Sequence, residues 1–190
     1  IEFQITDETF EKSMMLTRNN SANLHILLTT VVTILLYRYT NCEDVIIGTP
    51  IYQQSEELNY INTFILLKQR IDKEQSLKAL LLQTKKRMME GIYHQNFDLI
   101  KFSRKKRIHN ESNQDALFSV GVVVAELQNV CYLQTLSMDV LFDFSITESS
   151  IQGVIRYDAS RYQQDTIQRI SNQYVKTLQE FIKQPDQTID

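Results

Sequence analysis

Three histidines are the candidate acid–base groups of this 190-residue chain, and none of them has a catalytic partner at a familiar spacing. Catalysis needs a nucleophile beside a base, or paired carboxylates, or a metal. The sequence contains no G-x-S-x-G, H-E-x-x-H or Walker motif, and its four glycines leave no phosphate-binding loop. We therefore predict no catalytic residue and no metal site in this chain.

His94 is the histidine in the most motif-like setting, because it is the second residue of the segment YHQNFDLIKF at the end of an apolar-striped helix. It has no nucleophile or carboxylate beside it in sequence, so acid–base catalysis is the weaker interpretation. The stronger one is that its neutral ring hydrogen-bonds locally and fixes the loop after the helix. We expect His25 to be a packed structural residue of a core helix and His109 to be solvated.

The cysteines, the net charge and the first residues of the chain fit an ordinary globular protein. Cys42 and Cys131 form no C-x-x-C pair and lie near no histidine at ligand spacing, which predicts neither zinc nor disulfides and fits a reducing cytoplasm. The net charge of −3 argues against nucleic-acid binding. The start IEFQITDETF resembles no targeting signal and indicates a cut from something longer. The apolar run 26–37 is too short for a membrane span.

One charged segment departs from this background. Between Lys85 and Arg107 the chain carries eight basic residues against two acidic ones. They are Lys85, Lys86, Arg87, Lys101, Arg104, Lys105, Lys106 and Arg107. Either this is a solvated helix face, or it is a docking surface for an acidic partner.

The spacing of hydrophobic residues predicts the helices and strands that position the histidines and the basic segment. It predicts helices over 8–20, 22–40, 77–92 and 167–181. It predicts strands over 1–5, 44–50, 60–71, 116–127, 140–147 and 151–158, the last two joined as a hairpin through "ESS". Thr6 or Asp7 is the expected cap of the first helix and Ser21 of the second. Gly48 and Pro50 are expected to stop the second strand, and Pro185 to mark the end of the last helix.

Interleaved strands and helices with one late hairpin predict an α/β fold, a mixed β-sheet with packed helices. No repeat, linker or low-complexity segment divides the chain, so residues 1–190 are expected to form a single domain.

The order of the segments resembles the condensation domains of nonribosomal peptide synthetases. The stretch ANLHILLTTVVTILLYRYTNCEDVIIGTP resembles the family's core helix, "R-Y-T" turn, acidic pair, strand and "G-T-P". LNYINTFILLKQRI is similar to "I-G-x-F-V-N-T-L", and YHQNFDLIKF to "H-Q-x-x-P-F-E", with His94 and Gln95 in place. ALFSVGVVVAEL and the stretch from 141 to 182 are similar to the strand, hairpin and helix that close such domains. The departures from these motifs are Leu58, Leu67 or Lys68, and the run Asp98, Leu99 and Ile100.

The resemblance implies a chloramphenicol-acetyltransferase-like lobe, the C-terminal half of the family domain. The family's "H-H-x-x-x-D-G" motif belongs to the other half, and this chain has no consecutive histidines. The implied partners are that N-terminal lobe and acidic carrier domains, whose phosphopantetheine arms enter a tunnel between the lobes. By the same resemblance, the tunnel-facing residues are Tyr60, Asn62, Thr63, Ser119 and Gly121. The side chain of Asn62 is expected to form a hydrogen bond with the backbone or with a pantetheine amide. The residues expected to dock carriers are Lys85, Lys86, Arg87, Arg104, Lys105, Lys106 and Arg107.

Two other roles stay open from the sequence. One is a stand-alone module that docks carrier domains without chemistry. The other is the corresponding lobe of an epimerisation or heterocyclisation domain. In every case we expect no activity from the chain alone.

Overall fold

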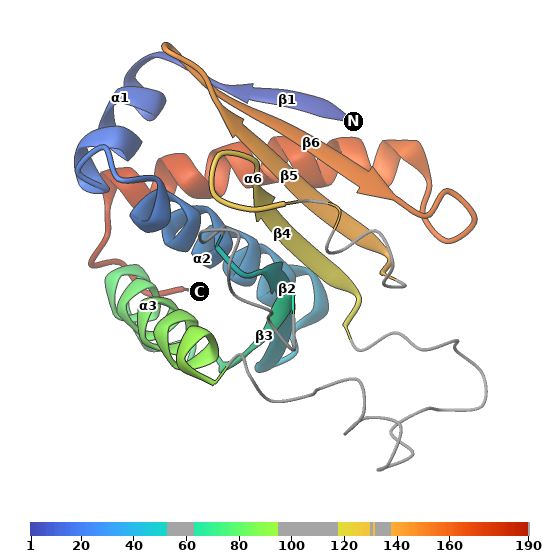
Figure 1. Cartoon of the computed structure of the whole chain (residues 1–190), viewed down its shortest axis with the longest axis horizontal. Helices are drawn as coiled ribbons and strands as arrows, with labels where there is room; N and C mark the ends of the chain where they lie inside the picture. Colours follow the sequence, from blue (N-terminus) through green and yellow to red (C-terminus); the bar gives the residue numbers. More distant parts are fainter. Residues whose placement is uncertain (53–62, 95–117, 130, 132–137, 190) are drawn as a thin grey trace, which may run out of the picture.

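The structure is a computed structural model that describes residues 1–52, 63–94, 118–129, 131 and 138–189 (Figure 1). In chain order its elements are β1 (Glu2–Ile5), α1 (Asp7–Leu16), α2 (Ser21–Thr40), β2 (Asp44–Pro50), β3 (Phe64–Arg70), α3 (Leu77–Tyr93), β4 (Val120–Val124), β5 (Val140–Ile146), β6 (Ile151–Tyr157) and α6 (Gln164–Lys183).

The strands form one mixed sheet in the order β1-β6-β5-β4-β2-β3. β4 runs parallel to both β2 and β5, while the remaining neighbours are antiparallel. β5 and β6 are the predicted hairpin, closed where Thr147 N–H donates to the Ser150 carbonyl oxygen at 2.8 Å. This confirms the predicted α/β class with a mixed sheet.

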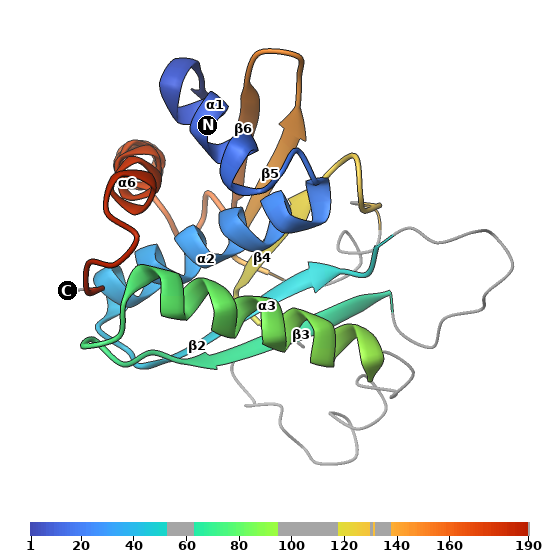
Figure 2. The ribbon, with the colours of Figure 1, turned by 90° about the vertical axis from the view of Figure 1, so that its left-hand side faces the viewer.

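Helices α2, α3 and α6 cover one face of the sheet, with α2 in the middle (Figure 2). Their apolar stripes meet the strands in one large core, which includes Leu28 and Val31 of α2, Phe142 and Phe144 of β5, and Tyr174 of α6. The Tyr174 hydroxyl donates to the Leu28 carbonyl oxygen at 3.3 Å, which satisfies its polar end inside the core.

α2 is the core helix that the sequence predicts, but its cap is one residue earlier than expected. The Asn20 side chain, not Ser21, accepts the bond from the Asn23 N–H at 2.9 Å, because Ser21 is already helical. The helix ends at Asn41, whose left-handed backbone lets its N–H reach the Tyr37 carbonyl oxygen. α2 is long and apolar enough to cross a membrane. However, 72% of its most apolar 18-residue stretch is buried inside the protein, as in a core helix.

The first helix also differs in its cap. Thr6 occupies the capping position of α1, but its hydroxyl donates to the Asp7 carboxylate at 2.7 Å, and no side-chain cap bond forms. Acidic Asp7 and Glu8 in the first turn still complement the helix dipole.

Gly48 lies inside β2, so its expected role in stopping the strand is wrong, whereas Pro50 ends β2 as predicted. A Cβ at this position would lie 2.1 Å from the ring of Phe118, which packs over the glycine. The residue serves close packing across the sheet and not a turn. β2 continues to Pro50, which pairs with Phe64 at the start of β3.

The face of the sheet opposite the helices has an apolar half and a polar half. Val122 and Val124 join the core beneath the helices, so alternation places Val123 on the opposite face. There it belongs to the outer apolar cluster, whose buried members are Phe64, Phe118, Val123 and Leu141. On the polar half, Arg156 of β6 pairs with Asp143 of β5 at 3.0 Å.

Candidate functional site

A buried polar network lies where β2 and β4 end, and His25 of α2 is its centre. Because β2 and β4 are parallel, their carboxyl ends lie at the same edge of the sheet, the edge where open α/β sheets commonly bind ligands. α2 runs back against β2, so its first turns bring His25 to this edge. His25 Nε2 lies 3.0 Å from Thr49 Oγ1, and its Nδ1 lies 3.2 Å from the Tyr52 hydroxyl.

Gln128, just after β4, ties the two strand ends together. Its side-chain amide donates to Thr49 Oγ1 at 3.0 Å and to the Pro50 carbonyl oxygen. Its side-chain oxygen accepts from the Val124 N–H at 3.0 Å. A backbone bridge also joins Tyr52 to Gln128, so the chain leaving β2 is held on both sides.

His25 is neutral in this network. It is fully buried, and burial lowers its pKa to about 3 by penalising the charged imidazolium. A neutral imidazole has one donor and one acceptor nitrogen, so one of the two hydroxyls, Thr49 or Tyr52, donates to the ring and the other accepts from it. Burial also raises the pKa of Tyr52 to about 12, so its hydroxyl stays protonated. A histidine with this pKa is a structural anchor and not a general base at neutral pH.

A second buried polar group joins α2, β3 and α3. Gln69 donates to Thr33 Oγ1 at 3.2 Å and accepts from Thr84 Oγ1 at 3.0 Å. Thr29 lies between Thr33 and His25 on the same stripe of α2, and its buried hydroxyl has no partner within the described residues. The polar stripe of α2 therefore contacts the end of β2 through His25 and, through Thr33 and Gln69, the residue Thr84 of α3.

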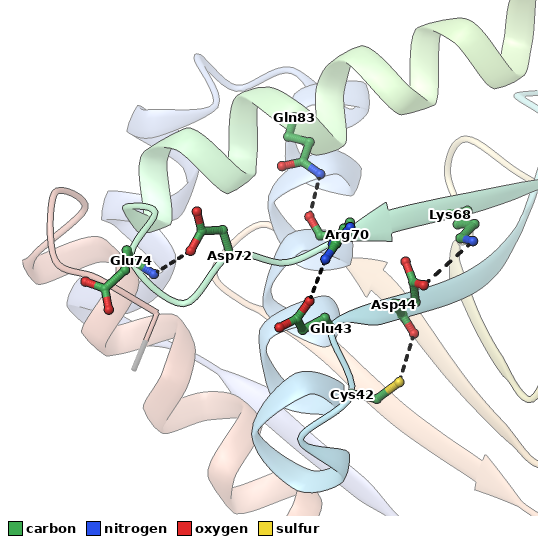
Figure 3. A network of polar contacts seen from close by, with 8 residues as sticks. All are labelled: Cys42, Glu43, Asp44, Lys68, Arg70, Asp72, Glu74 and Gln83. Carbon is green, nitrogen blue, oxygen red and sulfur yellow. Dashed lines mark hydrogen bonds and ion pairs between the residues drawn. The ribbon is translucent and has the colours of Figure 1, made fainter.

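The polar contacts at the other end of β2 and β3 are exposed (Figure 3). Lys68 of β3 pairs with Asp44 of β2 at 3.8 Å, and Arg70 of β3 pairs with Glu43, just before β2, at 3.2 Å. Gln83 of α3 donates to the Arg70 carbonyl oxygen at 3.0 Å and covers the end of this edge strand. Surface pairs of this kind contribute only about 0–1 kcal/mol each, so the network closes the edge of the sheet and is not a reaction centre.

The structure describes three of the five predicted tunnel residues and does not gather them. Thr63 directly precedes β3, beside the carboxyl end of β2, and its carbonyl oxygen accepts from the Ile51 N–H at 3.1 Å. Ser119 is exposed at the amino end of β4, and Gly121 is buried inside that strand opposite Gly48. Tyr60 and Asn62 lie outside the described residues.

His94 is placed where the sequence predicts the end of a helix. It is the C-cap of α3, and its backbone N–H donates to the Glu90 carbonyl oxygen at 3.0 Å. Its exposed ring meets the Tyr93 ring edge-on, with centroids 4.9 Å apart. Gln95 and His109 lie outside the described residues.

The described part of the basic segment lies on the exposed side of α3. Lys86 and Arg87 both approach Glu90, at 3.9 and 3.0 Å. Lys85 forms no ion pair within the described part of the chain. Arg104, Lys105, Lys106 and Arg107 lie outside the described residues, as does Lys101.

The network around Tyr52 and Gln128 is the feature that sequence reasoning missed. The available signal was the four-residue spacing of His25, Thr29 and Thr33, which puts one polar stripe on an otherwise apolar helix. The sequence alone cannot say which strand end that stripe meets. Among the described residues, no group of histidine, cysteine, aspartate or glutamate side chains has the arrangement of a metal site.

Comparison with known proteins places the chain in a family. The protein-family model described as "Condensation domain" matches residues 1–190. Bacitracin synthase 1 of Bacillus licheniformis is 24% identical over 190 residues, covering 90% of this chain and 4% of that protein. Gramicidin S synthase 2 of Brevibacillus brevis is 21% identical over 205 residues, which is 98% of this chain and 5% of that protein.

Solved structures agree at the level of the fold. The starter condensation domain of rhizomide synthetase RzmA aligns with a TM-score of 0.73 and 16% identity, covering all of this chain and 46% of that one. The X-domain from teicoplanin biosynthesis aligns with a TM-score of 0.81 and 14% identity, covering all of this chain and 48% of that one. The chain thus spans a small part of the curated synthases and about half of these structures, and it belongs to the condensation domain family.

Proposed function

We propose that this chain is the non-catalytic, C-terminal half of a nonribosomal peptide synthetase condensation domain. It forms one wall of the tunnel in which carrier-bound aminoacyl and peptidyl thioesters are joined into an amide. The observation that carries the proposal is the extent of the match: the family model covers residues 1–190, yet the chain spans only 46% of the starter condensation domain. A complementary half is therefore needed to complete the fold.

The chemistry of the described residues agrees with a positioning role. Buried His25 has its pKa lowered to about 3 by burial, and exposed His94 caps a helix. The hydroxyls beside His25, those of Thr49 and Tyr52, belong to a buried structural network. The rate of amide formation between two tethered substrates rises mainly because the amine and the thioester are held together. Residues that line the tunnel can do this without acting as a base. The catalytic histidine is proposed to belong to the N-terminal lobe.

The same proposal assigns Tyr60, Asn62, Thr63, Ser119 and Gly121 to the tunnel side and the basic segment to carrier docking. Phosphopantetheine then arrives on the carrier as the substrate arm. Support for docking is the exposure of Lys85, Lys86 and Arg87 on one helix. The two free, exposed thiols, Cys42 and Cys131, suit a cytoplasmic synthetase.

A condensation assay on the chain alone tests the absence of a catalytic group. The purified chain is mixed with two loaded carrier proteins, and dipeptidyl product is sought by mass spectrometry. We expect no product above the uncatalysed background. Turnover that disappears on His94→Ala would overturn the proposal and make His94 a catalyst. An upstream gene segment without an "H-H-x-x-x-D-G" motif would instead favour the stand-alone docking module.

A further inference from the structure

A groove of about 290 Å³ lies between the end of α1, the start of α2 and the middle of α3. Figure 2 shows α2 and α3 running along the same side of the sheet, with α1 joined to the start of α2. The residues that line the groove are Leu16, Thr17, Arg18, Asn23, Ile26, Leu27, Leu81, Leu82 and Lys85.

The groove is apolar at its base and exposes large apolar side chains at its rim. Ile26 and Leu27 are buried core residues of α2, whereas Leu16 is 48% exposed and Leu82 is 59% exposed. Met89, two turns along α3 from Leu82, is 62% exposed and extends the same surface. Exposed apolar side chains gathered at a concave site are typical of a surface that binds a partner.

The rim is held in place by the backbone of the α1–α2 connection. Arg18 adopts a left-handed conformation, as does Asn19 after it, whose N–H donates to the Met14 carbonyl oxygen at 2.8 Å. The Asn23 side chain donates to the Thr17 carbonyl oxygen at 3.2 Å. The groove is therefore formed before any partner arrives, which lowers the entropic cost of binding.

The charges at the rim are positive. Neighbouring cations are neutralised locally, since Lys12 pairs with Glu8 at 2.6 Å and Arg87 with Glu90 at 3.0 Å. Arg18 and Lys85 line the groove and form no ion pair within the described part of the chain. A partner seated here must place carboxylates beside these two cations.

The shape of the groove favours an elongated partner. Its volume of about 290 Å³ lies at the lower limit of pockets for drug-sized molecules, about 300–1,000 Å³, and its lining comes from three helices, so a helix lying along them can insert a few anchoring side chains. We propose that it binds a short amphipathic helix that inserts leucine-sized side chains between α1 and α3 and places carboxylates beside Arg18 and Lys85. This is helix-in-groove recognition, and it shares only Lys85 with the carrier-docking segment proposed above.

The test uses the 190-residue chain and two fluorescent, alanine-rich helical peptides. The acidic peptide has leucines on one face and glutamates on both flanks, and the matched peptide has lysine at every glutamate position. We expect saturable binding of the acidic peptide in fluorescence anisotropy, at least about tenfold tighter than that of the basic peptide.

Variants locate the binding. Arg18→Asp with Lys85→Glu should weaken the acidic peptide by about tenfold or more and reverse the preference between the peptides. Lys73→Glu with Lys78→Glu makes the same change in net charge outside the groove and should leave the affinity within about twofold. Leu82→Asn should weaken both peptides alike, because it removes an apolar anchor. Circular dichroism confirms that each variant is folded.

The proposal is overturned if neither peptide binds, or if both bind equally. It is also overturned if the groove variants and the Lys73/Lys78 control lose affinity to the same extent, since binding would then follow net charge alone.

Discussion

At the scale of single residues, the two described histidines, which are the candidate acid–base groups, have structural roles. His25 satisfies both ring nitrogens with Thr49 and Tyr52, and His94 ends a helix. The expectation that His25 is a structural residue of the core helix is confirmed. Its partners could not be predicted, because the contact joins residues 24 and 27 positions apart and depends on how α2 packs against β2.

The buried histidine makes stability depend on pH. Its folded pKa of about 3 lies below the unfolded value of 6.5, so the unfolded chain binds the proton more readily. Stability is therefore unaffected above pH 6.5 and is lost as the pH falls from 6.5 toward 3. Between pH 7.5 and pH 5 the loss from this group is about 2 kcal/mol.

Urea unfolding of the wild type and of His25→Gln at both pH values measures this loss. The variant should be less stable at pH 7.5 by about 1–3 kcal/mol, because it disturbs buried bonds, but its pH dependence should be smaller by about 2 kcal/mol. His94→Gln, at an exposed position, is the matched control and should retain the wild-type slope. An unchanged slope in His25→Gln would contradict the neutral, buried assignment.

At the scale of elements, periodicity predicted nearly every strand and helix that the structure describes. Alternation along 140–147 placed Phe142 and Phe144 on the covered face of β5, and the stripe of α6 was equally clear. The exceptions are local. Gly48 looked like a stop signal, but the ring that excludes a side chain there belongs to Phe118, on a segment far away in sequence.

Gly48→Ala tests this close approach. The added methyl group would meet the Phe118 ring at 2.1 Å, and overpacking of this kind typically costs about 1–3 kcal/mol of unfolding free energy. Adding Phe118→Ala should remove the penalty specific to the alanine, as measured by a double-mutant cycle in urea. Additive losses in the cycle would show that the two residues do not clash.

Gln69→Ala tests the polar contact between α2, β3 and α3. Gln69 is 1% exposed, and its removal leaves Thr33 and Thr84 without their shared partner, so we expect a loss of about 1–3 kcal/mol in unfolding free energy. Gln83→Ala, which removes an exposed bond to the Arg70 carbonyl oxygen, should cost clearly less. Equal losses in the two variants would mean that burial adds nothing at Gln69.

At the scale of the whole molecule, the order of motifs identified the family where no single motif did. That order survives divergence to 21% identity because it follows from the succession of core helix, strands and hairpin. The order of motifs did not place the predicted tunnel residues in the same way. Thr63 and Ser119 lie just outside strands β3 and β4, and local periodicity does not determine the direction of side chains at such positions.

The basic segment is tested in the intact condensation domain. Reversal of Lys85, Lys86, Lys105 and Lys106 to glutamate should slow carrier association at low salt. The difference should shrink at high salt, because the Debye length is about 8 Å at physiological ionic strength. Stopped-flow association rates measure both conditions. Equal rates for variant and wild type at both salt concentrations would mean that the basic residues are merely solvated and do not dock carriers.

Reconstitution from two separately produced halves tests the central claim most directly. The N-terminal half with the "H-H-x-x-x-D-G" motif and this chain are each assayed alone and then mixed with loaded donor and acceptor carriers. We predict dipeptidyl product only in the mixture, and its loss when the second histidine of that motif is changed to alanine. Product from this chain alone, or product from the N-terminal half that this chain does not increase, would contradict its assignment as the non-catalytic wall of the tunnel.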